Sequence, residues 1–317
     1  MTLMLYKYLS DPNLVISDGY IRGTQLSALN DPFEANYCKW SLEQLLTEIE
    51  IDSIKQDLIH RITERLKGVG VFSVTEVNDN LLMWSHYANQ HRGAALKFYF
   101  NQKINFLANP EITKDPITGS PNIFKRVQYR KRPKFKVDSF DTEYHFSPTL
   151  IDEIVQAVLL QKSEDWIYEQ ERRLILPLIY ADKVIVNNDS CNSPQVKRCI
   201  ELAAELSNER ELSVSIYERH TDGSQGLEYV FYPERVADQQ HRHLLGLALS
   251  CLSEKPDVVF LFKLSRCVLN GVVLGINHTQ GVREQYFNES ISFPMHYGYL
   301  QQAKRNPEMY AVDLQSI

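Results

Sequence analysis

Short runs rich in β-branched and aromatic residues recur along the whole chain, and helical patterns of uneven length separate them. Such runs predict strands where turn-forming residues bound them, whereas apolar residues at spacings of three and four predict helices. The two kinds of segment do not alternate in the regular repeat of a doubly wound parallel sheet. The sequence therefore predicts an α+β fold, with a mixed or mainly antiparallel sheet core and flanking helices.

The expected elements can be placed on the sequence by these patterns and by their caps. Strands are expected at residues 3–8, 71–75, 94–100, 126–130, 172–180, 212–217, 227–232, 257–264 and 267–276. Helices are expected at residues 41–68, 79–92, 147–169, 193–209, 234–252 and 279–287. Gly68 and Gly93 should end the first two helices, because glycine commonly follows a helix C-terminus.

With 317 residues the chain is long enough to bury a large core in one domain. We expect a single domain over residues 1–317, with its core in residues 1–181 and 257–317. The composition becomes more polar after residue 182. Residues 182–256 are therefore expected to form an inserted or peripheral layer.

The charge and cysteine content limit the possible classes of protein. The net charge of -6 means that the molecule as a whole does not attract phosphate backbones, so only a local basic patch could. Five cysteines without a CxxC pair argue against a disulfide framework and a zinc knuckle. We expect a cytoplasmic protein in a reducing compartment, without a metal site or a membrane segment. The oligomeric state stays open.

The stretch LSALNDPFEA, at residues 26–35, holds two acidic side chains around a proline. The residue before a proline avoids helical angles, and Asp bonds readily to its own backbone, so a turn is expected. In one interpretation it is a rigid turn with Phe33 filling the core. In the other, Asp31 and Glu34 form a carboxylate pair at a pocket edge, and Arg22 just upstream clamps a phosphate.

The stretch NLLMWSHYANQHRG, at residues 80–93, sets several donors and aromatic rings into one short helix. The helical spacing favours Trp84 as a core residue, whereas His86 and Tyr87 fall where their polar tips could line a cleft. His86 and His91 are five residues apart, which does not suit two metal ligands on one helical face. The helix is either a core element or one wall of a ligand site.

The stretch KRVQYRKRPKFK, at residues 125–136, carries seven basic residues interleaved with Tyr129 and Phe135. Charge and stacking of this kind can bind single-stranded nucleic acid. The alternation before a proline is equally typical of an edge strand on which lysines discourage further pairing. Both interpretations are kept.

The stretch DWIYEQERRLI, at residues 165–175, holds two carboxylates close together. If the chain is extended there, the two-residue period sends Glu169, Glu171 and Arg173 to one face. Two carboxylates so close disfavour each other's ionisation, so they indicate either a neighbouring cation or a functional role. They are either ion-paired at a strand end or positioned to stabilise positive charge on a sugar.

These stretches together resemble a bacterial family known as domain of unknown function 2971. The resemblance covers about residues 5–180 and is carried by LYKYL, LNDPFEA, FSVTEVNDNLLMWSHYANQHRG, RVQYRKRP and WIYEQERRL. CVLNGVVLGIN and MYAVDL, later in the chain, are similar to that family's closing strands. The family name implies no activity.

A fainter resemblance is to ADP-ribosyltransferases, which carry an arginine, then a serine strand, then an E-x-E pair. It implies that Arg22 supports a bound NAD, that Ser73 in the S-V-T strand shapes the nicotinamide pocket, and that Glu171 bonds the ribose while Glu169 orients the acceptor. We therefore expect a glycosyl transfer from NAD as co-substrate. The expected contacts to NAD are Arg22, Ser73, Thr75, Trp84, His86 and Tyr87.

Three functions follow from these observations. The first is an NAD-consuming ADP-ribosyltransferase or NAD glycohydrolase, with a nucleic acid or a protein as the acceptor, for which a bacterial defence or toxin role would suit the chemistry. The second is a nucleic-acid-binding or processing protein that uses residues 125–136. The third is a non-catalytic module for ligand sensing or interaction, in which all four stretches serve the fold.

Overall fold

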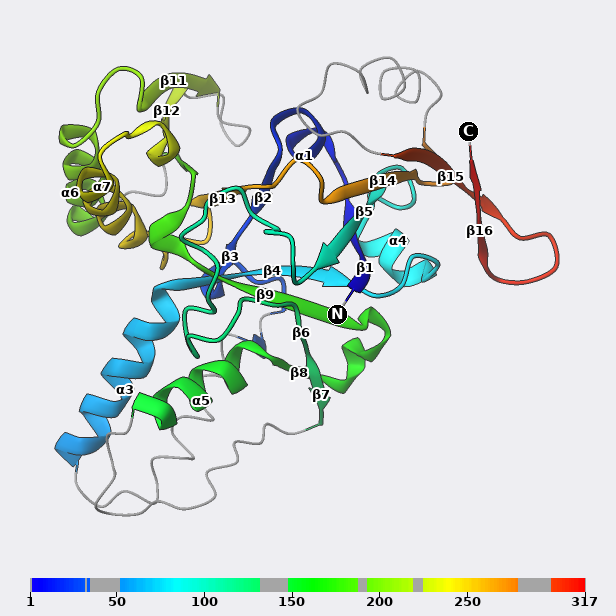
Figure 1. Ribbon diagram of the computed structural model, residues 1–317, viewed down its shortest axis with the longest axis horizontal. Helices are drawn as coiled ribbons and strands as arrows, with labels where there is room; N and C mark the ends of the chain where they lie inside the picture. The colour runs from blue at the N-terminus through cyan, green and yellow to red at the C-terminus, as the bar shows by residue number, and fades with distance from the viewer. Residues whose placement is uncertain are drawn as a thin grey trace.

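The described strands form two large sheets, and the larger of them contains strands from both ends of the chain (Figure 1). The computed structural model describes residues 2–31, 33–34, 52–131, 148–187, 193–218, 225–278 and 298–316. The α+β class predicted from the sequence is confirmed. Within the described ranges, no helix combines the length and apolarity needed to cross a membrane.

The first sheet has nine strands among the described residues, and β1 lies inside it. Its order is β16 (Val312–Ser316), β15 (Tyr299–Arg305), β14 (Leu269–Leu274), β5 (Ala94–Asn101), β1 (Thr2–Leu9), β4 (Val69–Thr75), β9 (Glu171–Pro177) and β6 (Lys125–Arg126), and β3 (Thr24–Gln25) pairs separately with β4. All neighbours are antiparallel except β14 and β15. β1 pairs with β5 along its whole length.

The second sheet is antiparallel throughout and supplies much of the core. Its order is β11 (Leu212–Glu218), β12 (Gln225–Phe231), β10 (Lys183–Asn187), β13 (Val259–Lys263) and β2 (Tyr20–Arg22). Phe231, Phe260 and Phe262 from this sheet share one buried cluster with Phe72 and Phe98 from the first. Apolar residues at alternate positions thus hold the two sheets together. β10 joins the predicted peripheral layer to β13 of the predicted core.

Two pairs of helices flank the sheets, α3 with α5 and α6 with α7 (Figure 1). The helices are α1 (Asn13–Asp18), α3 (Asp52–Lys67), α4 (Leu81–Tyr87), α5 (Pro148–Leu159), α6 (Pro194–Glu205) and α7 (Gln239–Ser250). The short 3₁₀ segments are η1 (Leu26–Ala28), η2 (Glu164–Glu169), η3 (Leu178–Tyr180) and η5 (Pro233–Arg235). α3 and α5 pack together around Ile62 and Val155, and both rest against Ile175 of β9. The predicted helix 279–287 and the first part of 41–68 lie outside the described residues.

Helix α4 is shorter than the predicted helix 79–92. Asn80 caps it by accepting hydrogen bonds from two backbone amides, and it ends at Tyr87. The chain then takes three consecutive left-handed residues: Asn89 (φ 45), Gln90 (φ 52) and His91 (φ 68). This turn brings Gly93 against β1, where a Cβ would lie 2.1 Å from the carbonyl oxygen of Leu9. Close approach to β1 therefore ends the helix early.

The predicted helix 147–169 also ends early, at Leu159. The chain continues as β8 (Gln161–Ser163), which pairs in parallel with β7 (Gln128–Arg130), and then as η2. The prediction failed because the apolar pattern ends with α5, while Ser163 begins a separate 3₁₀ turn by capping Asp165. Gln170 reverses the chain in a left-handed conformation, and β9 follows.

Candidate functional site

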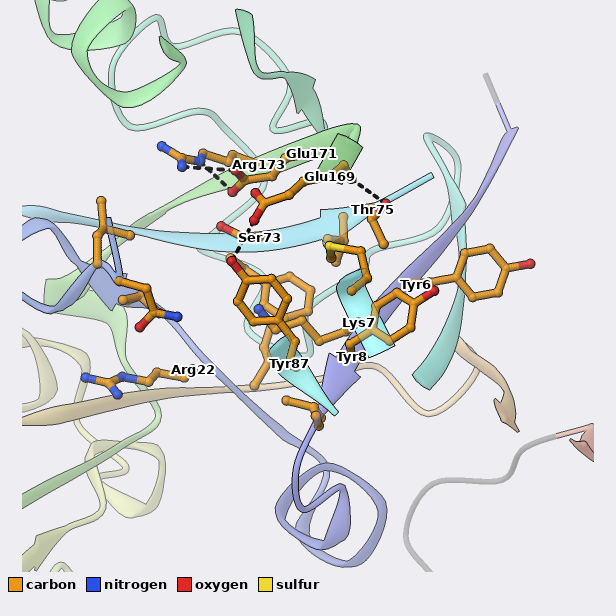
Figure 2. A pocket seen from close by; sticks show the side chains of 18 of the residues that line it. Tyr6, Lys7, Tyr8, Arg22, Ser73, Thr75, Tyr87, Glu169, Glu171 and Arg173 are labelled. Atoms are coloured by element: carbon orange, nitrogen blue, oxygen red, sulfur yellow. Dashed lines mark hydrogen bonds and ion pairs between the residues drawn. The ribbon is translucent and has the colours of Figure 1, made fainter. Parts of the chain in front are cut away.

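A pocket of about 470 Å³ lies where β1, β2, β4 and β9 come together (Figure 2). This volume is within the range of sites that bind small organic molecules. Six of the residues predicted for the site line it: Arg22, Ser73, Thr75, Tyr87, Glu169 and Glu171. They come from segments of the chain up to about 150 residues apart. The fold therefore gathers most of the predicted set in one place.

A chain of ion pairs runs along one wall of the pocket. Arg173 contacts Glu34 at 2.6 Å and Glu171 at 2.8 Å. Lys162 contacts Glu171 at 3.4 Å and Glu169 at 2.7 Å. All five side chains are largely buried, so water screens these pairs only weakly. Burial raises the pKa of Glu34, although the charges of Arg173 and Lys162 act in the opposite direction.

Glu171 is held as a carboxylate in this chain. Its burial would raise its pKa, but the charges of Arg173 and Lys162 and hydrogen bonds from Arg173 and Ser73 lower the pKa to about 2. Ser73 lies on β4 directly opposite Arg173 of β9, which places its hydroxyl beside the carboxylate. The carboxylate of Glu171 is thus ionised at any physiological pH.

Glu169 reaches the same wall from outside the strand. It lies at the end of η2, and the left-handed Gln170 separates it from β9. The Tyr87 hydroxyl donates to its carboxylate at 2.6 Å, and the Thr75 hydroxyl donates to its backbone carbonyl at 2.6 Å (Figure 2). Both glutamates line one pocket, as the sequence predicted, but the predicted extended chain is wrong for Glu169, because only Glu171 belongs to β9.

Arg22 lies on β2, away from the two glutamates (Figure 2). Its guanidinium donates to the carbonyl oxygens of Pro256, at 3.0 Å, and Val258, at 3.5 Å. Its Nε is buried without a partner, and no acidic side chain in the described part of the chain pairs with it. Burial lowers the pKa of Arg22. Such a guanidinium is suited to an anion that enters the pocket.

Lys7 on β1 is a pocket residue that the sequence analysis missed. Its ammonium lies 5.5 Å from the centre of the Phe72 ring, and no carboxylate of a described residue lies within ion-pair distance. Burial lowers its pKa to about 8, although Glu171 and Glu169 act in the opposite direction. An amine of this kind is partly neutral near physiological pH and can accept a proton. The alternation in LYKYL was a usable signal, because Lys7 stands between the buried Tyr6 and Tyr8.

Two of the predicted NAD contacts do not line the pocket. Trp84 is fully buried, donates its indole N–H to the carbonyl of Asn78 at 3.1 Å, and packs edge-on against Tyr8 at 4.9 Å. His86 is exposed outside the pocket. Of the three residues of α4 that were predicted to contact NAD, only Tyr87 lines the pocket. The core interpretation therefore applies to Trp84.

The NDPFE stretch lies at the pocket edge. Asp31 and Glu34 are buried and line the pocket, as one interpretation predicted. Asp31 accepts a hydrogen bond from the backbone of Phe33 at 2.9 Å, which is the expected aspartate turn. Phe33 is 70% exposed, so the interpretation in which it fills the core is wrong. The turn directs its ring outward.

The basic stretch begins at a sheet edge. β6 is the last strand of the first sheet, which agrees with the edge-strand interpretation of residues 125–136. Lys125 pairs with Asp115 at 2.8 Å and Arg126 with Glu76 at 2.9 Å, so part of the charge is neutralised. The Tyr129 hydroxyl accepts from the backbone N–H of Glu171 at 2.7 Å and thereby supports the pocket. Residues 132–136 lie outside the described part of the chain.

The lining of the pocket includes no cysteine among the residues that the structure describes. Cys199, Cys251 and Cys267 are free thiols. No three His, Cys, Asp or Glu side chains gather there as a metal ion would require.

Comparison with known proteins supports the family resemblance found in the sequence. Residues 83–174 match a family described as "Protein of unknown function (DUF2971)". The match begins in α4, ends in β9, and includes both Glu169 and Glu171. No curated protein and no solved structure matches the chain.

Proposed function

We propose that the protein cleaves the bond between nicotinamide and ribose in NAD, as an ADP-ribosyltransferase or an NAD glycohydrolase. The observation that carries the proposal is the ionised, buried Glu171 beside Ser73, in a pocket that also holds a guanidinium without an acidic partner in the described chain. Arginine, serine strand and E-x-E occur in this order in the resemblance to ADP-ribosyltransferases.

The chemistry requires a fixed negative charge beside the ribose. Departure of nicotinamide leaves positive charge on the ribose, so the transition state resembles an oxocarbenium ion. A carboxylate fixed in a buried wall stabilises that charge more than it stabilises neutral ribose. Glu171 has this role in the proposal, because its ion pairs keep it ionised and in one orientation.

The other pocket residues suit the remaining parts of NAD. Arg22 lies opposite the glutamates and offers a guanidinium to the pyrophosphate. Tyr8 and Tyr87 add aromatic surface for the nicotinamide ring. Glu169, beside Glu171, then accepts a proton from the acceptor or from water.

The test combines calorimetric titration of NAD with measurement of nicotinamide release, using wild type and Glu171→Gln. We expect wild type to bind NAD and release nicotinamide, and Glu171→Gln to bind while release falls at least about a hundredfold. Absence of binding at millimolar NAD, or equal release by the two proteins, would refute the proposal.

A matched control separates chemistry from stability. Glu76 also pairs with an arginine of β9, Arg172, but lies outside the pocket. Glu76→Gln should keep full nicotinamide release. If it loses as much release as Glu171→Gln does, the effect comes from β9 and not from charge beside the ribose.

A ligand sensor without catalysis is the second candidate. Lys162 lies between Glu169 and Glu171 and neutralises part of the charge that catalysis would use. In this case NAD or another nucleotide binds with an affinity that depends on Arg22, and no nicotinamide appears. The same titration therefore distinguishes the two functions.

A further inference from the structure

A second cleft, of about 500 Å³, shares Tyr20 with the pocket but is otherwise lined by different residues. We call it the basic cleft. It is formed by Ser17, Asp18, Gly19, Tyr20, Lys183, Tyr232, Glu234, Arg235, Lys263, Leu264 and Arg266. These residues come from the end of α1, from β2, from the start of β10, from the η5 region and from the end of β13. Tyr20 is shared by the two cavities.

The charge of the basic cleft is opposite to that of the whole molecule. Its lining holds four cationic side chains and two acidic ones, whereas the chain carries a net charge of -6. Glu234 is already bound, because it accepts from the Tyr20 hydroxyl and from Lys263 at 2.8 Å. Lys183, Arg235 and Arg266 have no acidic partner within ion-pair distance among the residues that the structure describes.

Aromatic rings hold several of these cations in place. The Lys183 ammonium lies 5.5 Å from the ring centres of both Tyr20 and Tyr232. The Arg235 guanidinium stacks on the Tyr232 ring, 3.6 Å from its centre. Lys263 lies 5.5 Å from the Tyr20 ring. Cation–π contacts fix side chains without using up their hydrogen-bond donors. Lys263 donates to Glu234, and Arg235 donates through one Nη to the carbonyl oxygen of Arg210 at 2.8 Å. Among the described residues, the donors left for a ligand include those of Lys183 and the other N–H groups of Arg235.

The strand register explains why these residues converge. Tyr20 of β2 pairs directly with Lys263 of β13, and the partner of Lys183 on β13 is two residues from Lys263. All three therefore project from one face of the second sheet. The opposite face carries Ile21 and Phe262, which are buried in the core. The cleft is thus set on a rigid sheet.

We propose that the basic cleft is a second binding site, which takes the phosphate groups of a nucleotide or of a nucleic-acid chain. Phosphate is the anion that several converging lysine and arginine donors bind best. The cavity is large enough for a group of nucleotide size. This proposal does not depend on cleavage of NAD.

The test is calorimetric titration of the full chain with two probes, sodium tripolyphosphate and a short single-stranded thymidine oligonucleotide. Lys183→Gln/Arg266→Gln removes two cations from the cleft and leaves neutral polar side chains in their place. Lys304→Gln/Arg305→Gln is the matched control, because it removes two exposed cations from β15. Arg22→Gln tests binding in the pocket instead. Circular dichroism and thermal unfolding check that each variant folds.

We expect wild type to bind at least one probe, with affinity at least about tenfold weaker in Lys183→Gln/Arg266→Gln and unchanged in the control. Tighter binding of the oligonucleotide, with strong dependence on salt, identifies a nucleic-acid chain as the source of the phosphates. Tighter binding of tripolyphosphate identifies a free nucleotide. No binding of either probe, equal losses in both double variants, or a loss caused only by Arg22→Gln would overturn the proposal.

Discussion

Replacing Glu171 by glutamine should destabilise the protein in a pH-dependent way. The folded state lowers the pKa of this carboxyl from its ordinary 4.5 to about 2, so the folded protein binds the proton less tightly than the unfolded chain does. The ionised carboxylate therefore contributes about 3 kcal/mol of stability at neutral pH. This contribution is complete above pH 4.5 and is lost as the pH falls toward 2. By pH 3 about half of it remains.

Urea unfolding, followed by tryptophan fluorescence, measures the effect, because Trp84 is fully buried in the folded protein. Glu171→Gln should lower the free energy of unfolding by about 3 kcal/mol at pH 7, and by about half as much at pH 3. The slope against urea should not change. A difference that is the same at both pH values, or below about 1 kcal/mol at pH 7, would show that the ion pairs do not hold the carboxylate as argued.

Three further changes test other parts of the fold. Lys7→Met should raise the free energy of unfolding by about 3 kcal/mol at pH 7. Because burial lowers the pKa of Lys7 from 10.5 to about 8, the cost of its charge is relieved as the pH rises through this range, and the two proteins should converge near pH 10.5 in urea unfolding. Trp84→Ala should cost about 4 kcal/mol of stability in the same assay, and a loss under about 1 kcal/mol would contradict its place in the core. Gly93→Ala should cost about 3 kcal/mol, because the new Cβ would lie 2.1 Å from the carbonyl oxygen of Leu9. Gly68→Ala, whose Cβ would meet nothing closer than 3.7 Å, is its control and should change the melting temperature little.

The strands were predictable because their signal is local. β1, β4 and β5 begin and end within about two residues of the runs expected from their branched and aromatic residues. The ends of helices were less predictable, since they depend on distant contacts. Nothing in the sequence around residue 88 indicates that the chain must turn to meet β1, and three left-handed residues result from that contact.

The pocket residues that carry a recognisable sequence signal were predicted. Those that reach the pocket only through strand pairing were missed. Glu169, Glu171 and Arg22 carried visible signals, namely two close carboxylates and a guanidinium after a strand. Lys162 did not, because it was expected in the middle of a helix. It enters the site only because α5 stops at Leu159 and β8 pairs with β7. The role of a side chain there depends on an element boundary that local propensity does not determine.

The position of β1 has a consequence for synthesis of the chain. β1 is synthesised before both of its neighbours in the sheet, β4 and β5, and the second of these ends only at Asn101. Until both have left the ribosome, the apolar β1 has two open edges, and such edges pair readily with other chains. Aggregation is therefore most favoured while β1 has left the ribosome and β5 has not. A chaperone would protect the nascent chain most at that stage.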